Sequence, residues 1–200
     1  SWNVRKTTCY VHMWVDTSAN SQSGPLIDGS YSQGNTTTDQ IFHVATTGSD
    51  ETGDGSEESP FATIQKAVNV ASNGDTILVM NGLYIENIDW STTNNIRLIG
   101  SHIDSTIIDG GNNGKVIDNS DETSHPIEIS NLTIQNGYIE GDTYGYCGGG
   151  IDIYFSSSTL MNVIISNNSS TNCGGGIFLF NSSANLMGVT FNGNSADHGG

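Results

Sequence analysis

Positive charge is scarce in this chain of 200 residues. Lys and Arg together number 5 against 21 Asp and Glu, which gives a formal net charge of −16 at pH 7. Phosphate backbones would repel such a chain, so we expect no nucleic acid partner. The acidity is compatible with bound calcium, with a cationic surface or with a saline exterior, and solubility alone explains it equally well.

Long apolar runs are also lacking. Apolar residues make up 34% of the chain, and no stretch approaches the roughly 20 consecutive apolar residues of a membrane span. We therefore expect no membrane span. Ile and Val are concentrated in short alternating runs, which can supply the narrow core of a solenoid. The abundance of Asn, Ser, Thr and Gly beside so little Lys favours an extracellular or cell-surface location.

A repeat organises residues 147–200. Cys147-Gly-Gly-Gly-Ile151 recurs as Cys173-Gly-Gly-Gly-Ile177, 26 residues later, and a third copy starts at His198-Gly-Gly200 after a further 25. Within the copies, short period-two runs are bounded by Gly, Asn and Ser, as strands are bounded by turns. About 25 residues divided among short strands and turns make one coil of a parallel β-helix, stacked on the next coil at about 4.8 Å.

Asn168 and Asn194 occupy the same position in consecutive repeats. Stacked asparagines can form an amide ladder, as identical side chains do along stacked strands. An ordinary left-handed turn residue explains them as well.

The repeat resembles known families. Gly-Gly-Gly-Ile followed by Val189-Thr-Phe-Asn-Gly-Asn194 resembles the GG[AG]I and FxxN repeats of polymorphic outer-membrane adhesins. It is equally similar to the right-handed parallel β-helix, pectate-lyase-like superfamily. The resemblance implies an all-β fold, a right-handed parallel β-helix. It does not imply an activity, because the same coils carry lyases, hydrolases, adhesins and tailspikes.

The cysteines number 3, and two of them stack. Cys147 and Cys173 hold the same corner of adjacent coils, where a spacing of about 4.8 Å lies within the usual disulfide range. A Cys147–Cys173 disulfide would fit an oxidising compartment, and two free thiols are the alternative. His198 continues the column, but a Cys-Cys-His metal site would lack an evident fourth ligand.

The chain divides near residue 42. Residues 1–41 lack the repeat and are interpreted as an N-terminal strand or arm and a linker: the end of a preceding domain, a cover on the β-helix flank, or an arm that docks on a neighbour. Residues 42–200 are interpreted as a capped parallel β-helix, incomplete at its C-terminal end. Ser59-Pro60 predicts a helix start that would cap the first coil. The segment 42–86 resembles the N-terminal cap module of secreted β-helix proteins, including some polysaccharide lyases.

An acidic loop at residues 50–58 is a candidate calcium site. Asp50, Thr52 and Asp54 follow the alternating oxygen ligands of an EF-hand-like loop. The glutamate expected at the twelfth position is replaced by Phe61, so a solvated acidic turn is the alternative. Calcium is the cofactor expected here, if there is one.

No residue is assigned a catalytic role. The resemblance to polysaccharide lyases implies calcium and a Lys or Arg that takes a proton from the sugar. Two basic residues have acids nearby, and we expect both groups to be surface ion pairs. A glycoside hydrolase needs two carboxylates on one cleft; Asp152 faces outward, but Phe178 replaces it on the next coil, so no acidic column is expected. The two groups are Lys115 with Asp118, Asp121 and Glu122, and Arg97 with His102 and Asp104.

An aromatic strip is the candidate binding surface. Tyr154 and Phe180 should stack outward on adjacent coils with Phe178 beside them, whereas Phe155 falls on the other side of the alternation. The strip could stack on sugar rings or pack against another protomer. Alternatively, the N-terminal arm covers it.

These features favour an extracellular or cell-surface structural or adhesive β-helix protein. Gly199-Gly200 begins another coil without a cap, so end-to-end assembly into filaments or arrays is expected. The partners would be further copies, other surface proteins or glycans. The alternatives are a calcium-dependent polysaccharide lyase, or another carbohydrate-active β-helix protein, with its active site beyond the visible coils, and a carbohydrate-binding module that uses the aromatic strip.

Overall fold

The computed structural model describes residues 39–90, 95–120, 126–141 and 147–199, all within a compact unit of residues 37–200. Residues 1–38 of the predicted N-terminal arm therefore lie outside the described residues. In the described part of the chain, no helix is long and apolar enough to cross a membrane.

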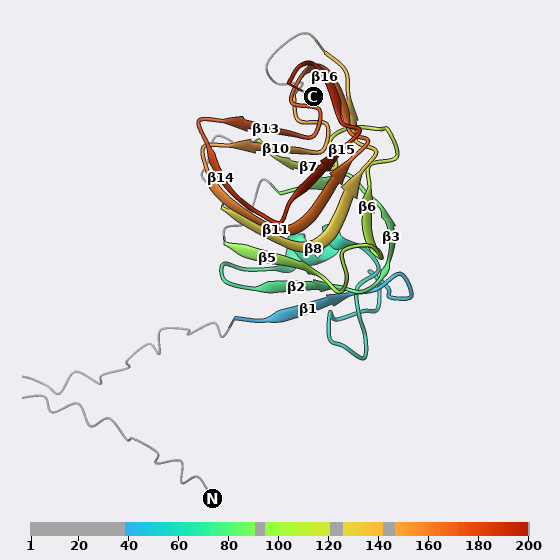
Figure 1. The fold of residues 1–200 in the computed structure, drawn as a ribbon. Helices are drawn as coiled ribbons and strands as arrows, with labels where there is room; N and C mark the ends of the chain where they lie inside the picture. The colour runs from blue at the N-terminus through green and yellow to red at the C-terminus, as the bar shows by residue number, and fades with distance from the viewer. Residues whose placement is uncertain (1–38, 91–94, 121–125, 142–146, 200) are drawn as a thin grey trace, which may run out of the picture. The chain divides into compact units, whose positions relative to one another are not determined.

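Strands wind through three parallel sheets (Figure 1). Sheet A has the order β1-β2-β5-β8-β11-β14; in addition, β6 pairs with β8 and with β3, and β15 pairs with β11. Sheet B has the order β13-β10-β7-β4, and sheet C has β16-β12-β9. The strands of sheet A are β1 Ile41–Val44, β2 Thr76–Val79, β3 Gly82–Ile85, β5 Ile96–Gly100, β6 Thr106–Asp109, β8 Ile127–Gln135, β11 Ser157–Ser166, β14 Ser183–Met187 and β15 Thr190–Asn192. Those of sheets B and C are β4 Ile88–Asp89, β7 Ile117–Asn119, β10 Ile151–Tyr154, β13 Ile177–Phe180, β9 Tyr138–Ile139, β12 Ser169–Cys173 and β16 Ser195–His198.

The predicted parallel β-helix is confirmed. Each strand pairs in parallel with the equivalent strand of the next coil, for example β11 with β8 and with β14. The core is a set of apolar columns along the solenoid. Leu98, Ile129 and Leu160 are in register and fully buried, and each such side chain stabilises the fold by about 1.5–3 kcal/mol.

The predicted cap helix is present, but it is shorter than expected. Helix α1 spans Ile64–Val70, and its N-cap is Thr63, whose hydroxyl accepts a hydrogen bond from the Lys66 N–H at 3.2 Å. Ser59 was the wrong N-cap because Phe61 pairs with β1 through backbone hydrogen bonds, which keeps the segment before Thr63 extended. The helix buries Ile64, Ala67 and Val68 in the core next to β1, β2 and β4.

The amide ladder at Asn168 and Asn194 is present. Asn168 is fully buried, and its Nδ2 donates to Asn194 Oδ1 at 3.1 Å and to the carbonyl of Ile134 at 3.2 Å. Its Oδ1 accepts from the Gly137 N–H at 2.8 Å. The left-handed turn conformation belongs instead to the preceding residue, Asn167, with φ of 55°.

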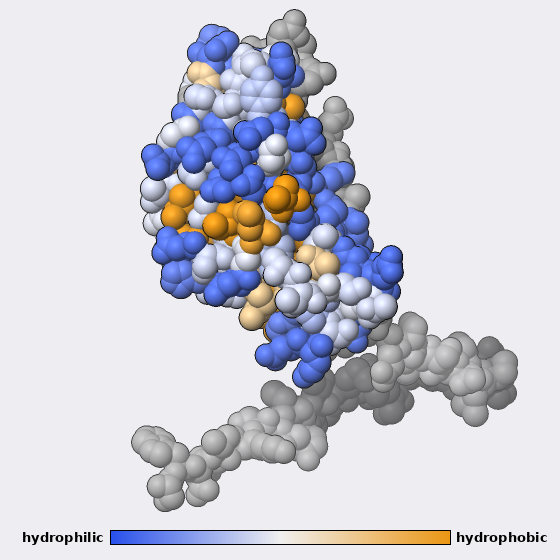
Figure 2. All heavy atoms as spheres, turned by 90° about the vertical axis from the view of Figure 1, so that its right-hand side faces the viewer, coloured by the Kyte–Doolittle hydropathy of each residue, from blue (hydrophilic) through white to orange (hydrophobic). Residues whose placement is uncertain are grey.

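Exposed apolar side chains gather on β3. Leu83 is 52% exposed and Ile85 71%, and Ile107 of β6 pairs beside Leu83. Figure 2 looks onto the side of the molecule that lies to the right in Figure 1, where β3 and β6 are, and shows apolar residues surrounded by hydrophilic ones. This patch serves as a reference surface in the experiments below.

Candidate functional site

An acidic column runs along the outer face of sheet B. Asp89, Asp118 and Asp152 are in register on β4, β7 and β10, and Phe178 continues the column on β13. The prediction that no acidic column forms is therefore wrong. The column ends after Asp152, because Phe178 takes the equivalent position on the following coil. On the two preceding coils it continues through Asp118 and Asp89.

Lys115 joins two of these carboxylates. Its Nζ lies 3.3 Å from Asp118 Oδ1 and 2.5 Å from Asp152 Oδ2. The side chain of Lys115 is 9% exposed, that of Asp118 is 40% exposed and that of Asp152 is fully buried. The prediction of a surface ion pair is wrong, because Lys115 is buried against Asp152 of the next coil. The sequence alone did not pair Lys115 with Asp152. Asp121 and Glu122 lie outside the described residues.

Burial dominates the electrostatics of this cluster. Burial, only partly offset by the nearby Lys115 ammonium, raises the pKa of Asp152 to about 7. Burial alone would lower the pKa of Lys115, but the charges of Asp152 and Asp118 outweigh it and raise that pKa. Lys115 therefore stays protonated at neutral pH, whereas Asp152 gains or loses its proton near pH 7.

The backbone next to this cluster is held in place on both sides. Asn87 Nδ2 donates to the Lys115 carbonyl at 2.8 Å, and Gly114 exchanges backbone hydrogen bonds with Tyr138. Gly114 has a φ of 110°, which a residue with a side chain rarely adopts. A hollow of about 390 Å³ opens beside Lys115 and Asp118, lined also by Asp89 and Ile139.

Four aromatic rings cluster on sheet B beside the acidic column. Tyr154 lies 5.0 Å from Phe180, 6.1 Å from Phe178 and 6.3 Å from Phe155, measured between ring centroids. Phe155 also meets Phe180 edge to face at 5.7 Å. Phe155 and Phe180 are 39% and 38% exposed. The predicted strip is thus a cluster of four, because Phe155 has a φ of 48° and leaves the strand alternation.

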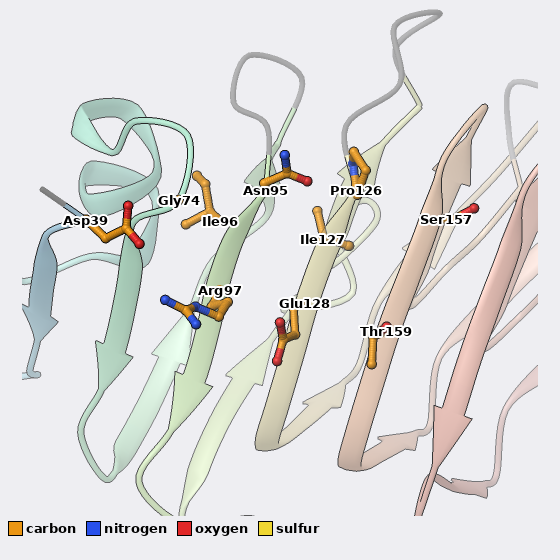
Figure 3. Close-up of a pocket in the computed structure, with 10 residues that line it drawn as sticks. All are labelled: Asp39, Gly74, Asn95, Ile96, Arg97, Pro126, Ile127, Glu128, Ser157 and Thr159. Carbon is orange, nitrogen blue, oxygen red and sulfur yellow. The ribbon is translucent and has the colours of Figure 1, made fainter. Parts of the chain in front are cut away.

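Sheet A carries a different surface, a polar groove of about 360 Å³ (Figure 3). Arg97, Glu128 and Thr159 are in register on β5, β8 and β11 and line it. Figure 3 shows Arg97 turned toward the coil of β2, where its Nε donates to Thr76 Oγ1 at 3.1 Å. Among the described residues, no aromatic side chain lines this groove.

The predicted partners of Arg97 bond to each other instead. His102 Nδ1 lies 4.0 Å from Asp104 Oδ2, and both side chains are more than half exposed. His102 Nδ1 also accepts a hydrogen bond from the Asp104 N–H at 3.3 Å, and the expected ion pair of Arg97 with Asp104 is not formed, since Arg97 donates to Thr76.

The candidate calcium residues make structural contacts. Both carboxylate oxygens of Asp50 accept hydrogen bonds, from the backbone of Ala62 and Thr63 and from the Thr63 hydroxyl. Asp54 Oδ1 accepts from the Ser56 N–H at 2.9 Å, and the Thr52 N–H donates to a serine hydroxyl. In the described parts of the chain, no group of three or more His, Cys, Asp or Glu could hold a metal ion. Calcium binding stays a prediction.

Cys147 and Cys173 form a disulfide between adjacent coils, with a Cα–Cα distance of 4.8 Å. His198 is in register with Cys173, as its place in the repeat indicated. The bond occupies both sulfur atoms, so the conjectured Cys-Cys-His metal site is not formed by these residues in this state.

Sequence reasoning missed Asp89 and Phe155. A signal for Asp89 exists, because the dipeptide Ile-Asp recurs at Ile88-Asp89, Ile117-Asp118 and Ile151-Asp152. The intervals of 29 and 34 residues differ from the 26 of the clear repeat, which hid the pattern. Phe155 carried no signal, since only its positive φ moves it to the outer face.

Comparisons with known proteins add little. No family model matches the chain, and no curated protein matches it. Among solved structures, the chain is similar to a pectin methylesterase mutant in complex with a hexasaccharide, with 15% identity and a TM-score of 0.42. The match covers 78% of this chain and 54% of that one, so this chain spans about half its length. By its own strand pairing, this chain is an all-β parallel β-helix, and the similarity assigns it no activity.

Proposed function

We propose that this chain is an extracellular, adhesive β-helix protein that binds carbohydrate on the outer face of sheet B. The observation that carries the proposal is the aromatic cluster of Tyr154, Phe155, Phe178 and Phe180, beside carboxylates on the same face. Pyranose rings present apolar C–H faces that pack on aromatic rings, and their hydroxyl groups donate to carboxylates.

The charge of the chain favours a neutral glycan. With a net charge of −16, the protein would repel a polyuronate such as pectate unless cations bridged the two. Asp89 and Asp118 can accept from sugar hydroxyls, because Asp89 is exposed, the Asp118 side chain is 40% exposed, and both border the hollow. The groove on sheet A supports carbohydrate binding less well, since none of its lining residues in the described part of the chain is aromatic.

The enzymatic alternative stays a proposal. A calcium-dependent polysaccharide lyase, or another carbohydrate-active enzyme, would draw on the side-by-side carboxylates of Asp118 and Asp152 with Lys115 between them. Its support is the pKa of Asp152 near 7, which suits acid–base work at neutral pH.

Self-assembly is a second candidate, favoured by the apolar residues of the last described coil. Leu179, Leu186 and Phe191 are 37–47% exposed, although they are in register with the fully buried Ile153, Leu160 and Ile165. A further coil stacked there, from the same polypeptide or from another copy, would cover them. Electron microscopy of the purified protein tests this, because stacked copies would appear as filaments.

Affinity electrophoresis through gels that contain a soluble polysaccharide tests the proposal. Neutral xylan or β-glucan should retard the protein more than pectate or alginate, and Phe180→Ala should weaken retardation about tenfold, which corresponds to about 1.4 kcal/mol. Leu83→Ala is the matched control, since it removes an exposed apolar side chain far from sheet B. No retardation by any polymer would contradict the proposal. Ultraviolet-absorbing unsaturated products from pectate or alginate would favour the lyase.

A further inference from the structure

We propose that Lys115 and Asp152 condense into an intramolecular isopeptide bond that links adjacent coils of the β-helix, with Asp118 carrying the proton. The proposal is independent of glycan binding. It rests on the placement of one amine and two carboxyl groups on the outer face of sheet B.

The reacting amine and carboxyl groups are in contact and shielded from water. Lys115 Nζ lies 2.5 Å from Asp152 Oδ2, and the carboxyl group of Asp152 is fully buried. Intramolecular reactions between well-oriented groups reach effective molarities of roughly 10⁵–10⁸ M, and the fixed placement of Lys115 beside Asp152 is a start toward such an orientation.

Burial lets the carboxyl group of Asp152 take up a proton near neutral pH, whereas the neighbouring carboxylates raise the pKa of Lys115, so its ammonium must give up a proton before it can attack. A buried ammonium and carboxylate lose their hydration, and moving one proton from Nζ to the carboxyl group leaves a neutral amine and a neutral acid. The raised pKa of Asp152 shows that its carboxyl group accepts a proton near neutral pH. A neutral lysine amine is a competent nucleophile.

The step balances without another reactant. Nζ attacks Asp152 Cγ to form a C–N bond, and a C–O bond of the carboxyl group breaks. Asp118, whose Oδ1 lies 3.3 Å from Nζ, takes a proton from the nitrogen and returns it to the leaving hydroxide. One amide and one water form from one amine and one carboxylic acid, and Asp118 ends as it began.

The position of the bond gives it a structural purpose. Lys115 lies just before β7 and Asp152 lies on β10, its neighbour in sheet B. The disulfide Cys147–Cys173 joins the coil of β10 to the following coil. The two bonds would hold three consecutive coils together covalently on one side of the solenoid.

Mass spectrometry of the reduced, full-length protein after incubation at pH 7 tests the proposal. We expect the mass to be about 18 Da below that of the polypeptide, the loss of one water. Trypsin should fail to cut after Lys115, and a branched peptide should contain Lys115 and Asp152. Asp118→Asn should slow the reaction, and Asp152→Asn should lose ammonia instead, about 17 Da.

Lys115→Arg is the decisive control, because a guanidinium stays protonated and is no nucleophile. It should keep the full polypeptide mass. A water loss that persists in Lys115→Arg would belong to a succinimide at an Asp-Gly pair such as Asp109-Gly110 and would overturn the proposal. So would an unmodified wild-type mass with normal cleavage after Lys115. If Lys115→Arg fails to fold, the branched peptide that joins Lys115 to residue 152 decides, because a succinimide at an Asn-Gly pair such as Asn113-Gly114 also loses about 17 Da.

Discussion

The outer faces of sheets A and B share one backbone geometry but differ in chemistry. Both present columns of side chains in parallel register. On sheet A, Arg97 and Glu128 line an open polar groove, whereas on sheet B Lys115 and Asp152 are buried in contact. An exposed ion pair is solvated and contributes little, and a buried one must be neutralised or paired. Burial, and not the type of residue, therefore makes sheet B the reactive face.

Removing the lysine from sheet B should have the largest effect. Lys115→Ala leaves the Asp152 carboxylate buried and unpaired, which costs about 3–5 kcal/mol. If the isopeptide bond has formed, its loss also frees a 37-residue loop, worth about 4 kcal/mol. Urea denaturation measures the free energy of unfolding. A loss below about 1 kcal/mol would contradict the claim that the buried cation of sheet B matters more than the exposed cation of sheet A.

Breaking the disulfide comes next in size. Cys173→Ser opens the loop that Cys147 and Cys173 close over 26 residues, which should lower the free energy of unfolding by about 2–4 kcal/mol. The same urea titration measures it, with and without reductant. A wild-type protein as stable with reductant as without it would show that the disulfide does not stabilise the coils around sheet B.

The pKa values of one aspartate on each sheet should be shifted in opposite directions. Burial raises the pKa of Asp152 on sheet B to about 7. On β6 of sheet A, burial is outweighed by hydrogen bonds from Gln135, Gly111 and Asn136, which lower the pKa of Asp109. Carboxyl NMR on protein not yet cross-linked should show both shifts, and the cross-linked form should show no titration at Asp152.

The stability consequences have opposite signs as well. The unfolded pKa of Asp lies near 3.9. Asp152 contributes stability that is complete below that value and is lost as the pH rises through about 7. Asp109 contributes stability that is present above about 3.9 and is lost as the pH falls through its lowered folded value. Equal titration midpoints for Asp152 and Asp109 would contradict the claim that the two sheets shift carboxyl pKa values in opposite directions.

The smallest effect should come from the charged pair of sheet A. Arg97→Ala removes an exposed guanidinium with one side-chain hydrogen bond, to Thr76, so the free energy of unfolding should fall by at most about 1 kcal/mol. This variant is the matched control for Lys115→Ala, because each removes one cation with an acid on the next coil, Glu128 for Arg97 and Asp152 for Lys115. A loss as large as that of Lys115→Ala would remove the distinction between the sheets.

The sequence predicted the coils because their signals are local. Alternating Ile and Val, the Gly-rich corners and the equal positions of Cys147 and Cys173 lie within one or two repeats. The acidic column could not be found in the same way, since Asp89, Asp118 and Asp152 are brought together by coils of unequal length. Burial of Lys115 was missed because it depends on the neighbouring coil. The first helix turn was misplaced because pairing of Phe61 with β1 overrode the Ser-Pro signal.

The central claim is that sheet B, and not sheet A, is the carbohydrate-binding face. The most direct test is an amide NMR titration of the ¹⁵N-labelled protein with a neutral xylan or β-glucan oligosaccharide. The account predicts shifts concentrated at Tyr154, Phe178 and Phe180 and near Asp118, with little change at Arg97 and Glu128. Shifts confined to the groove of Arg97 and Glu128, or no shifts with any oligosaccharide tested, would contradict it.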